Sequence, residues 1–220
     1  MLYVVATPIG NLEDITIRAI KVLKEVDLIL AEDTRKTSIL LKHYNIKNKL
    51  LSFYEHNEIE RIPYIISQLK LNKKIALVSN AGTPTISDPG YKLIRECKKN
   101  SIEVIPIPGP CSISASLSVS SIPHDKFIFL GYLPKKNKRI EVFNKIKDFN
   151  FTFLFFESPK RIVSTLLDLE KIFGNRNITI ARELTKKFEE VLELDIKEAI
   201  EYFKNKKPKG EFTVIVGRHE

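Results

Sequence analysis

Short apolar runs recur along the chain and are separated by polar segments that contain glycine and proline. Such runs are typical of buried strands, whereas apolar residues spaced on one helical face predict helices. In the first half, strands are predicted at 2–6, 27–31, 49–54, 75–79 and 102–107. Helices are predicted between them at 16–26, 37–44, 58–71, 91–99 and 112–121. This alternation predicts a mainly parallel sheet with helices on both faces.

The pattern changes near Pro123, where aromatic-rich runs begin. Further strands are predicted at 127–133, 151–157, 177–181 and 211–216, and further helices at 140–147, 160–173 and 196–204. We therefore predict two α/β/α domains with mainly parallel sheets, which span residues 1–122 and 123–220.

Small and polar residues follow four strands of the first half. The segments are TPIGN at 7–11, AEDTRK at 31–36, SNAGTP at 79–84 and PGPCS at 108–112. Because the carboxyl ends of parallel strands meet at one edge of a sheet, these loops predict a small-molecule crevice there. Ordinary tight turns are the alternative. None of the loops is a G-x-G-x-x-G fingerprint or a phosphate loop.

The composition of the chain bears on which class of partner it binds. The chain has 36 basic and 27 acidic residues among 220, a net charge of +9, which favours a polyanionic partner such as nucleic acid. The competing explanation is that lysine-rich and asparagine-rich usage reflects genome base composition. The apolar runs are too short to span a membrane, and the chain starts without a signal-peptide pattern, so we expect a cytoplasmic protein.

Cysteine and histidine spacing predicts no metal site and reduced thiols. The residues concerned are Cys97, Cys111, His43, His56, His124 and His219.

Eight segments together resemble a known family in order and spacing. They are ATPIGNLEDIT, AEDTRKT, SNAGTPTISDPGY, PIPGPC, FLGYLPKK, FFESPKR, ARELTKKFEE and KGEF. The chain resembles, from residue 2 to 217, the bacterial small-subunit ribosomal RNA cytidine 2′-O-methyltransferases. These enzymes belong to the tetrapyrrole-methylase superfamily of S-adenosylmethionine-dependent methyltransferases.

The resemblance implies a tetrapyrrole-methylase-like fold, with the methyl donor S-adenosyl-L-methionine bound in the cleft between two domains, and a homodimer. It implies methylation of the 2′-hydroxyl of a cytidine ribose in the decoding region of 16S rRNA, with free rRNA or the assembled small subunit as substrate. Two alternatives stay open: a methyltransferase of a tetrapyrrole-like small molecule, and a non-catalytic RNA-binding protein with a degenerate donor pocket.

Donor-binding residues are implied by matching this chain to the family motifs. They are Pro8, Asn80, Ala81, Gly82, Thr83, Cys111, Ser112, Phe156 and Ala181. Asn80 is a departure, because relatives carry aspartate there. Asparagine keeps a carbonyl acceptor but loses the negative charge.

Methyl transfer to a ribose hydroxyl requires alignment of two substrates and removal of a proton. Asp33, Glu183 and Lys186 are the predicted base or orienting residues. The alternatives are a surface ion pair between Asp33 and Arg35, and ordinary solvated charges at the other two positions.

Basic clusters predict the RNA contacts. The predicted phosphate-binding residues are Arg35, Lys135, Lys136, Lys138, Arg139, Lys160, Arg161 and Lys187. Tyr132 and Phe188 lie beside such clusters and are candidates for stacking on an unpaired base, with core packing as the alternative for Phe188.

Overall fold

The computed structural model describes every residue except 207 and 220. The chain divides into two compact units, Met1–Cys111 and Ser112–Glu220, and each is described by itself. The sequence prediction put the boundary after residue 122. The structure puts it earlier because helix α5 (Ser112–Ser118) packs on strand β10 (Phe212–Val216) of the second unit.

The first unit has a five-stranded sheet in the order β3-β2-β4-β1-β5. The strands are β1 (Leu2–Val5), β2 (Leu28–Ala31), β3 (Leu50–Ser52), β4 (Ile75–Val78) and β5 (Val104–Ile107). All neighbouring strands run parallel, which confirms the parallel sheet predicted for this half.

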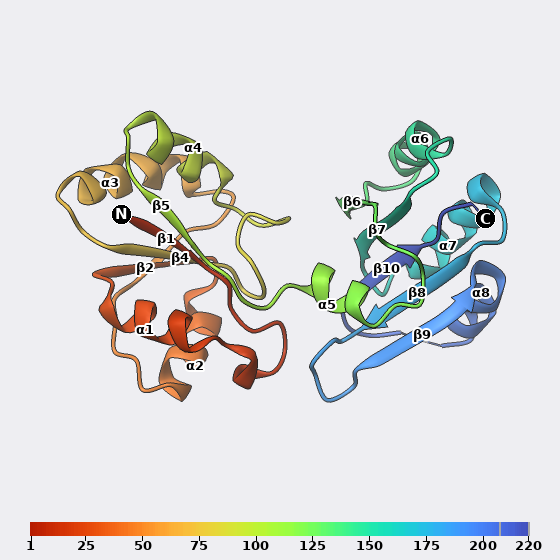
Figure 1. Ribbon diagram of the computed structural model, residues 1–220, viewed down its shortest axis with the longest axis horizontal. Helices are drawn as coiled ribbons and strands as arrows, with labels where there is room; N and C mark the ends of the chain where they lie inside the picture. Colours follow the sequence, from red (N-terminus) through yellow and green to blue (C-terminus); the bar gives the residue numbers. More distant parts are fainter. Residues whose placement is uncertain (207, 220) are drawn as a thin grey trace. The chain divides into compact units, whose positions relative to one another are not determined.

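Two pairs of helices cover the faces of this sheet (Figure 1). The helices are α1 (Ile17–Glu25), α2 (Thr34–His43), α3 (Glu58–Lys70) and α4 (Tyr91–Lys99), with a short 3₁₀ helix η1 at Leu12–Asp14. Ile29 and Ala31 pack in the core beneath α1 and α2, while Leu30 packs beneath α3 and α4. Alternate residues of one buried strand thus fill two cores, which explains its uninterrupted apolar run.

The second unit has a sheet in the order β6-β7-β10-β8-β9. Its further elements are β6 (Phe127–Tyr132), α6 (Asn137–Ile146), β7 (Thr152–Glu157), α7 (Ile162–Phe173), β8 (Asn177–Arg182), β9 (Glu190–Asp195) and α8 (Ile196–Lys204). β6 and β7 are parallel, but the other three pairings are antiparallel.

This mixed sheet corrects the prediction of a mainly parallel sheet in the second half. Strand β9 was not predicted, because its sequence EVLELD carries acidic residues and its apolar positions are only partly buried at the sheet edge. A short connection joins it to β8, and only antiparallel neighbours can be joined without a crossover.

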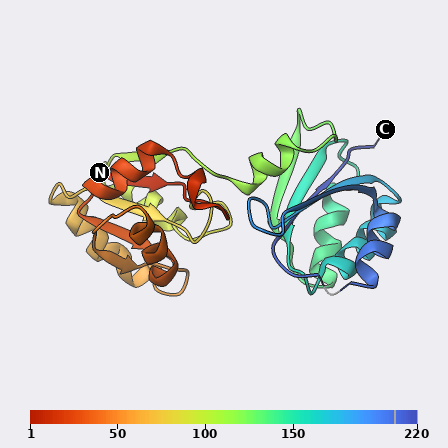
Figure 2. The same cartoon turned by 90° about the horizontal axis from the view of Figure 1, so that it is seen from below.

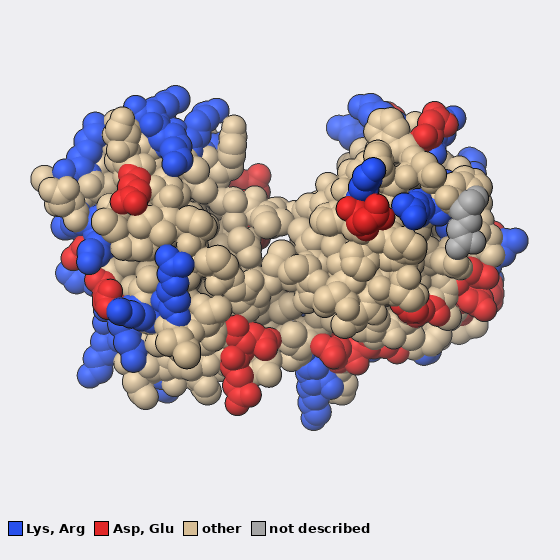
Figure 3. Space-filling view, viewed as in Figure 1, with Lys and Arg blue, Asp and Glu red and all other residues tan. Residues whose placement is uncertain are grey.

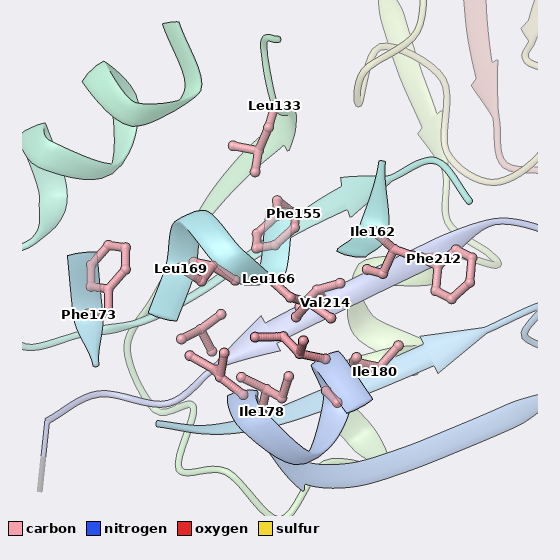
Figure 4. Close-up of a cluster of buried hydrophobic side chains, with 14 of the residues drawn as sticks. Leu133, Phe155, Ile162, Leu166, Leu169, Phe173, Ile178, Ile180, Phe212 and Val214 are labelled. Atoms are coloured by element: carbon pink, nitrogen blue, oxygen red, sulfur yellow. The ribbon is translucent and has the colours of Figure 1, made fainter. Parts of the chain in front are cut away.

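The main core of the second unit lies between one face of this sheet and helices α6 to α8 (Figures 2 and 4). Phe155 and Val214 point into that core. Their neighbours Leu154 and Ile215 point to the opposite face, where they pack against Leu117 of α5.

Strands β6, β7 and β8 run in the same direction, since β7 and β8 are both antiparallel to β10. Their carboxyl ends therefore meet at one edge of the second sheet, together with the start of β10. We call this the carboxyl edge of the second unit. Among the described residues, no helix combines the length and apolarity needed to cross a membrane.

Candidate functional site

The four loops predicted to form a crevice are joined at the carboxyl edge of the first sheet. The Thr7 N–H donates to the Gly82 carbonyl and the Gly82 N–H donates to the Thr7 carbonyl, both at 2.9 Å. The Thr83 hydroxyl donates to the Pro110 carbonyl at 3.2 Å, and the Asn80 N–H donates to Oε2 of Glu32 at 3.3 Å. The structure thus brings together the ends of β1, β2, β4 and β5.

Close backbone approach in this cluster depends on two glycines. A Cβ on Gly109 would lie 3.1 Å from Cβ of Ala6, tighter than ordinary contact. Gly82 has φ of +80°, a backbone conformation that residues with a side chain rarely adopt, and a Cβ there would lie 3.4 Å from Cγ2 of Ile9. Steric restriction therefore explains why glycine occupies these two positions of the predicted loops.

Asn80 presents an unsatisfied acceptor in this cluster. Its Oδ1 atom is buried and has no hydrogen-bond partner among the described residues. Such a buried polar atom costs about 1–3 kcal/mol unless a partner satisfies it. A ligand N–H or O–H would remove that cost, so the atom fits a donor-binding role for the loop.

A pocket of about 120 Å³ lies next to Asn80, lined in part by Thr7, Pro8, Lys36 and Ser79. Pockets for whole drug-sized ligands are roughly 300–1,000 Å³, so this one accommodates only part of such a molecule.

Asp88, in the same loop, was not predicted as a functional residue. Burial raises its pKa to about 6, the charge of Glu32 adds to the rise, and a hydrogen bond with Ser79 opposes it. The backbone near it is strained, with φ of 74° at Thr85 and 65° at Ser87. Its place in the turn sequence SDPG predicted a loop but gave no sign of its burial.

Asp33 caps the amino end of α2. Its carboxylate accepts from the Arg35 N–H at 2.9 Å and from the Arg35 guanidinium at 3.0 and 2.8 Å. The side-chain hydrogen bond from Arg35 is the largest cause that lowers the Asp33 pKa to about 2. A carboxylate of such low pKa accepts protons poorly, so the geometry matches the alternative of a local ion pair.

In the second unit, the predicted residues Phe156 and Ala181 lie in one row across neighbouring strands. Both pair in register with Thr213 of β10, from its two sides. The Phe156 ring lies 5.3 Å from the ring of Tyr132 at the end of β6. Ser112 begins α5 in this unit, whereas Cys111 ends the first unit.

Glu183 and Lys186 contact each other at the carboxyl edge of the second unit. The Lys186 ammonium donates to Oε1 of Glu183 at 2.9 Å and to Oε2 of Glu211 at 2.8 Å. Burial acts to lower the Lys186 pKa, but the hydrogen bonds to Glu211 and Glu183 outweigh it and the pKa is raised. Burial acts to raise the Glu183 pKa, but the bonds from Lys186 and the Glu211 backbone outweigh it and the pKa is lowered.

Both groups are therefore charged at neutral pH. A protonated lysine cannot accept a proton, which leaves Lys186 only an orienting role.

Most of the predicted RNA-binding lysines are exposed at or just beyond the same edge. Lys135, Lys136 and Lys138 follow β6, Lys160 follows β7 and Lys187 follows β8. Figure 3 shows basic side chains over α6, whose first turn includes Lys138 of the first of these clusters. Topology thus gathers three clusters that are separate in the sequence.

Two arginines of the predicted RNA-binding set are used inside the protein. Arg139 is only 4% exposed, and its guanidinium donates to Asp168, to the Thr165 hydroxyl at 2.6 Å and to the Ser164 carbonyl at 3.1 Å. Arg161 pairs with the buried Glu157 at 2.6 Å.

Arg139 is therefore corrected to a structural residue that ties α6 to α7. Its interior position follows from helical periodicity, which turns it inward while Lys138 faces solvent.

A larger groove of about 1260 Å³ lies at the opposite edge of the second sheet, and none of the predicted residues lines it. Its Arg176 stacks on Phe173 at 5.0 Å and donates to the Gly217 carbonyl at 3.3 Å. In the part of the chain that the structure describes, no group of three or more His, Cys, Asp or Glu side chains could hold a metal ion.

Comparisons with known proteins match the whole chain. Residues 1–200 match the family model described as Tetrapyrrole (Corrin/Porphyrin) Methylases. A Thermotoga maritima protein named ribosomal RNA small subunit methyltransferase I is 52% identical over 219 residues, covering 100% of this chain and 99% of the relative. A protein of the same name from Halalkalibacterium halodurans is 48% identical, covering 98% of this chain and 75% of the relative.

Among solved structures, a cobalamin biosynthetic enzyme, cobalt precorrin-4 methyltransferase, is similar with a TM-score of 0.74 and 15% identity, over 98% of this chain and 94% of that one. This likeness shows the fold, including the α/β class predicted from the sequence. The chain therefore belongs to the tetrapyrrole methylase family and, within it, to the ribosomal RNA small subunit methyltransferase I group.

Proposed function

We propose that this protein is an S-adenosyl-L-methionine-dependent methyltransferase that methylates the 2′-hydroxyl of a cytidine ribose in the decoding region of 16S rRNA. The observation that carries the substrate class is the full-length similarity, at 52% identity, to a protein named for methylation of small-subunit rRNA. Each unit taken by itself also supports it, the first through its joined loops at the strand ends and the second through its basic edge.

The donor fits the residues of the first unit in one specific respect. The buried Oδ1 of Asn80 has no partner among the described residues and would accept a hydrogen bond from it. Pro8, the residues Ala81 to Thr83, and Cys111 lie on the joined loops and would hold it through main-chain contacts. When bound, S-adenosyl-L-methionine supplies a methyl group on a positively charged sulfur.

Proton removal from the ribose hydroxyl needs a group whose pKa lies near the working pH. Asp33 has a pKa of about 2, and Lys186 is held protonated by two carboxylates. Glu183 is held as a carboxylate by Lys186, which suits an orienting role. Asp88, with a pKa of about 6, meets the pKa requirement best among these acids.

RNA binding is proposed for the exposed lysines of the carboxyl edge of the second unit. Lys135, Lys136, Lys160 and Lys187 come from three different loops. Positive charge at one edge would neutralise several phosphates together and position the strand, without selecting its sequence.

A tetrapyrrole-like acceptor is the second candidate, favoured by the fold of cobalt precorrin-4 methyltransferase. Its carboxylates would also be attracted to lysines. The two candidates differ in which acceptor receives the methyl group.

The test uses the purified full chain with labelled methyl donor. Small subunits from a strain that lacks this methyltransferase, deproteinised 16S rRNA and a precorrin-type tetrapyrrole serve as separate acceptors. We expect label in rRNA, recovered as 2′-O-methylcytidine, and none in the tetrapyrrole.

Thr83→Arg should abolish methyl transfer, because the larger side chain would occupy the space between the joined loops. Ser67→Arg, on the exposed side of α3, is the control and should leave the transfer unchanged. Label in the tetrapyrrole alone would contradict the proposal. Calorimetry tests the alternative of a non-catalytic RNA-binding protein. That alternative predicts that the protein binds RNA but gives no heat of binding when S-adenosyl-L-methionine is added.

A further inference from the structure

Phe188 stands in the connection between β8 and β9, residues 183–189, which we call the β8–β9 loop. Its side chain is 65% exposed, so the structure excludes the core packing considered for it from the sequence. Phe149, which precedes β7 at the opposite edge, is comparably exposed at 52%. A single exposed aromatic residue is ordinary on a protein surface, but the loop that carries Phe188 is unusually well fixed.

The β8–β9 loop is held by many internal contacts. The Lys186 N–H donates to the Glu183 carbonyl at 2.9 Å, and the Glu189 N–H donates to the Lys186 carbonyl at 3.0 Å. The Glu189 carboxylate in turn accepts from the Thr185 N–H. The Lys186 ammonium links Glu183 to Glu211, so side chains brace the base of the loop.

Backbone strain and close packing accompany this bracing. Glu183 has φ of 50° and Thr185 has φ of 64°, both in the left-handed region that non-glycine residues avoid. Gly210 allows the loop to approach the segment that leads into β10, since a Cβ there would lie 2.3 Å from Cγ of Glu183. A surface loop that keeps strained residues in place is typical of a preorganised functional element.

One lysine lies beside the exposed ring, and others lie on loops at the same edge of the sheet. The Lys187 ammonium lies 5.6 Å from the centroid of the Phe188 ring. Lys135, Lys136 and Lys160 are exposed on loops at the same edge. An exposed aromatic ring beside lysines is the combination that proteins use to bind single-stranded nucleic acid, with the ring under a base and the lysines at phosphates.

We propose that the β8–β9 loop is a stacking platform, in which Phe188 packs against an unpaired base of the RNA substrate and Lys187 contacts the adjacent phosphate. The proposal rests on the proposed function, since it takes small-subunit rRNA as the ligand. It assigns Glu183, Lys186 and Glu211 the role of bracing the loop. Sequence-specific RNA recognition targets single-stranded bases that are splayed out of the stack, and a fixed aromatic ring lowers the cost of holding such a base.

The experiment measures affinity of the full chain for 16S rRNA purified from a strain that lacks this methyltransferase, over a series of salt concentrations. Loss of one base stack corresponds to about a tenfold weakening. Phe188→Ala should therefore weaken binding about tenfold at every salt concentration, with an unchanged salt slope. Phe188→Tyr should retain affinity. Lys187→Gln should instead reduce the slope of log affinity against log salt by about 0.7.

Phe149→Ala is the matched control, because it removes a comparably exposed ring from the other edge and should leave binding unchanged. A short single-stranded RNA containing 2-aminopurine gives a direct signature: its fluorescence should be quenched by the wild-type protein and by Phe188→Tyr, but less by Phe188→Ala.

Unchanged rRNA affinity and unchanged quenching in Phe188→Ala would overturn the stacking platform and leave the proposed function intact. Loss of binding to assembled subunits alone, or a change in oligomeric state with normal RNA binding, would mean that Phe188 meets a protein, which also overturns it. Failure of the wild-type protein to methylate rRNA would instead overturn the proposed function.

Discussion

Asn80 and Asp88 show how strongly one loop of the first unit is specialised at the residue scale. Asn80 buries an oxygen that has no partner among the described residues, and Asp88 carries a carboxyl whose pKa is raised to about 6. Neither arrangement favours stability, because burying unpaired polar groups and charges costs free energy. Both arrangements support the ligand-binding role proposed for this loop.

Asp88 makes a pH-dependent prediction. Its pKa rises from an ordinary 3.8 to about 6 on folding, so between these values the folded protein binds more protons than the unfolded chain. Its contribution to the free energy of unfolding therefore falls as pH rises from about 4 to about 6.

Asp88→Asn should gain stability relative to the wild type over that interval, as measured by urea unfolding at a series of pH values. Asp33→Asn provides the opposite case. Because the Asp33 pKa is lowered to about 2, that substitution should lose relative stability as pH rises from about 2 to about 4. A difference between wild type and Asp88→Asn that does not vary with pH would contradict this account of Asp88.

At the scale of elements, the first turn of α6 carries two neighbouring basic residues with different roles. Lys138 is exposed, while the neighbouring Arg139 is buried against Thr165 and Asp168 of α7. A basic cluster in the sequence thus contains both a surface charge and an internal tie between helices.

Arg139→Met should destabilise the protein by about 2–4 kcal/mol, because it leaves Asp168 without its partner in a largely buried network. Urea or thermal unfolding measures this loss. Lys138→Gln is the matched control and should change stability by less than about 0.5 kcal/mol. Equal effects of the two substitutions would show that Arg139 is not the tie described here.

The sequence predicted elements well where periodicity was strong and poorly where charges dominated. Helix α4 has the predicted bounds, because Leu93 and Cys97 mark a clear buried face. Strand β9 was missed, since Glu190, Glu193 and Asp195 interrupt its apolar residues at the sheet edge.

The site was predictable to a similar degree. Glycine and proline at strand ends predicted the loops that the structure joins, as the contacts of Thr7 with Gly82 show. The burial of Asp88 and Arg139 and the exposure of Phe188 depend on long-range packing, which local sequence patterns do not report.

On the scale of the whole molecule, the excess of basic residues becomes informative only through topology. A net charge of +9 alone left genome composition as an explanation. The common direction of β6, β7 and β8 places lysines from three loops at one edge, which composition does not require.

Replacing Lys135 and Lys136 by glutamate should weaken 16S rRNA binding and reduce the slope of log affinity against log salt by about 1.4 to 1.8, since two phosphate contacts are lost. Filter binding over a salt series measures both quantities. Replacing Lys171, near the end of α7, and Lys197, at the start of α8, by glutamate makes the same change in net charge away from this edge. An equal loss of affinity in that control would mean that overall charge, and not the carboxyl edge of the second unit, governs binding.

The central claim is methylation of one ribose in small-subunit rRNA, and the most direct measurement maps ribose methyl groups in 16S rRNA with and without this protein. The account predicts that a deletion strain lacks a 2′-O-methyl group at a single cytidine in the decoding region. The wild-type gene should restore it, and Thr83→Arg should not. A complete set of ribose methyl groups in the deletion strain would contradict the claim.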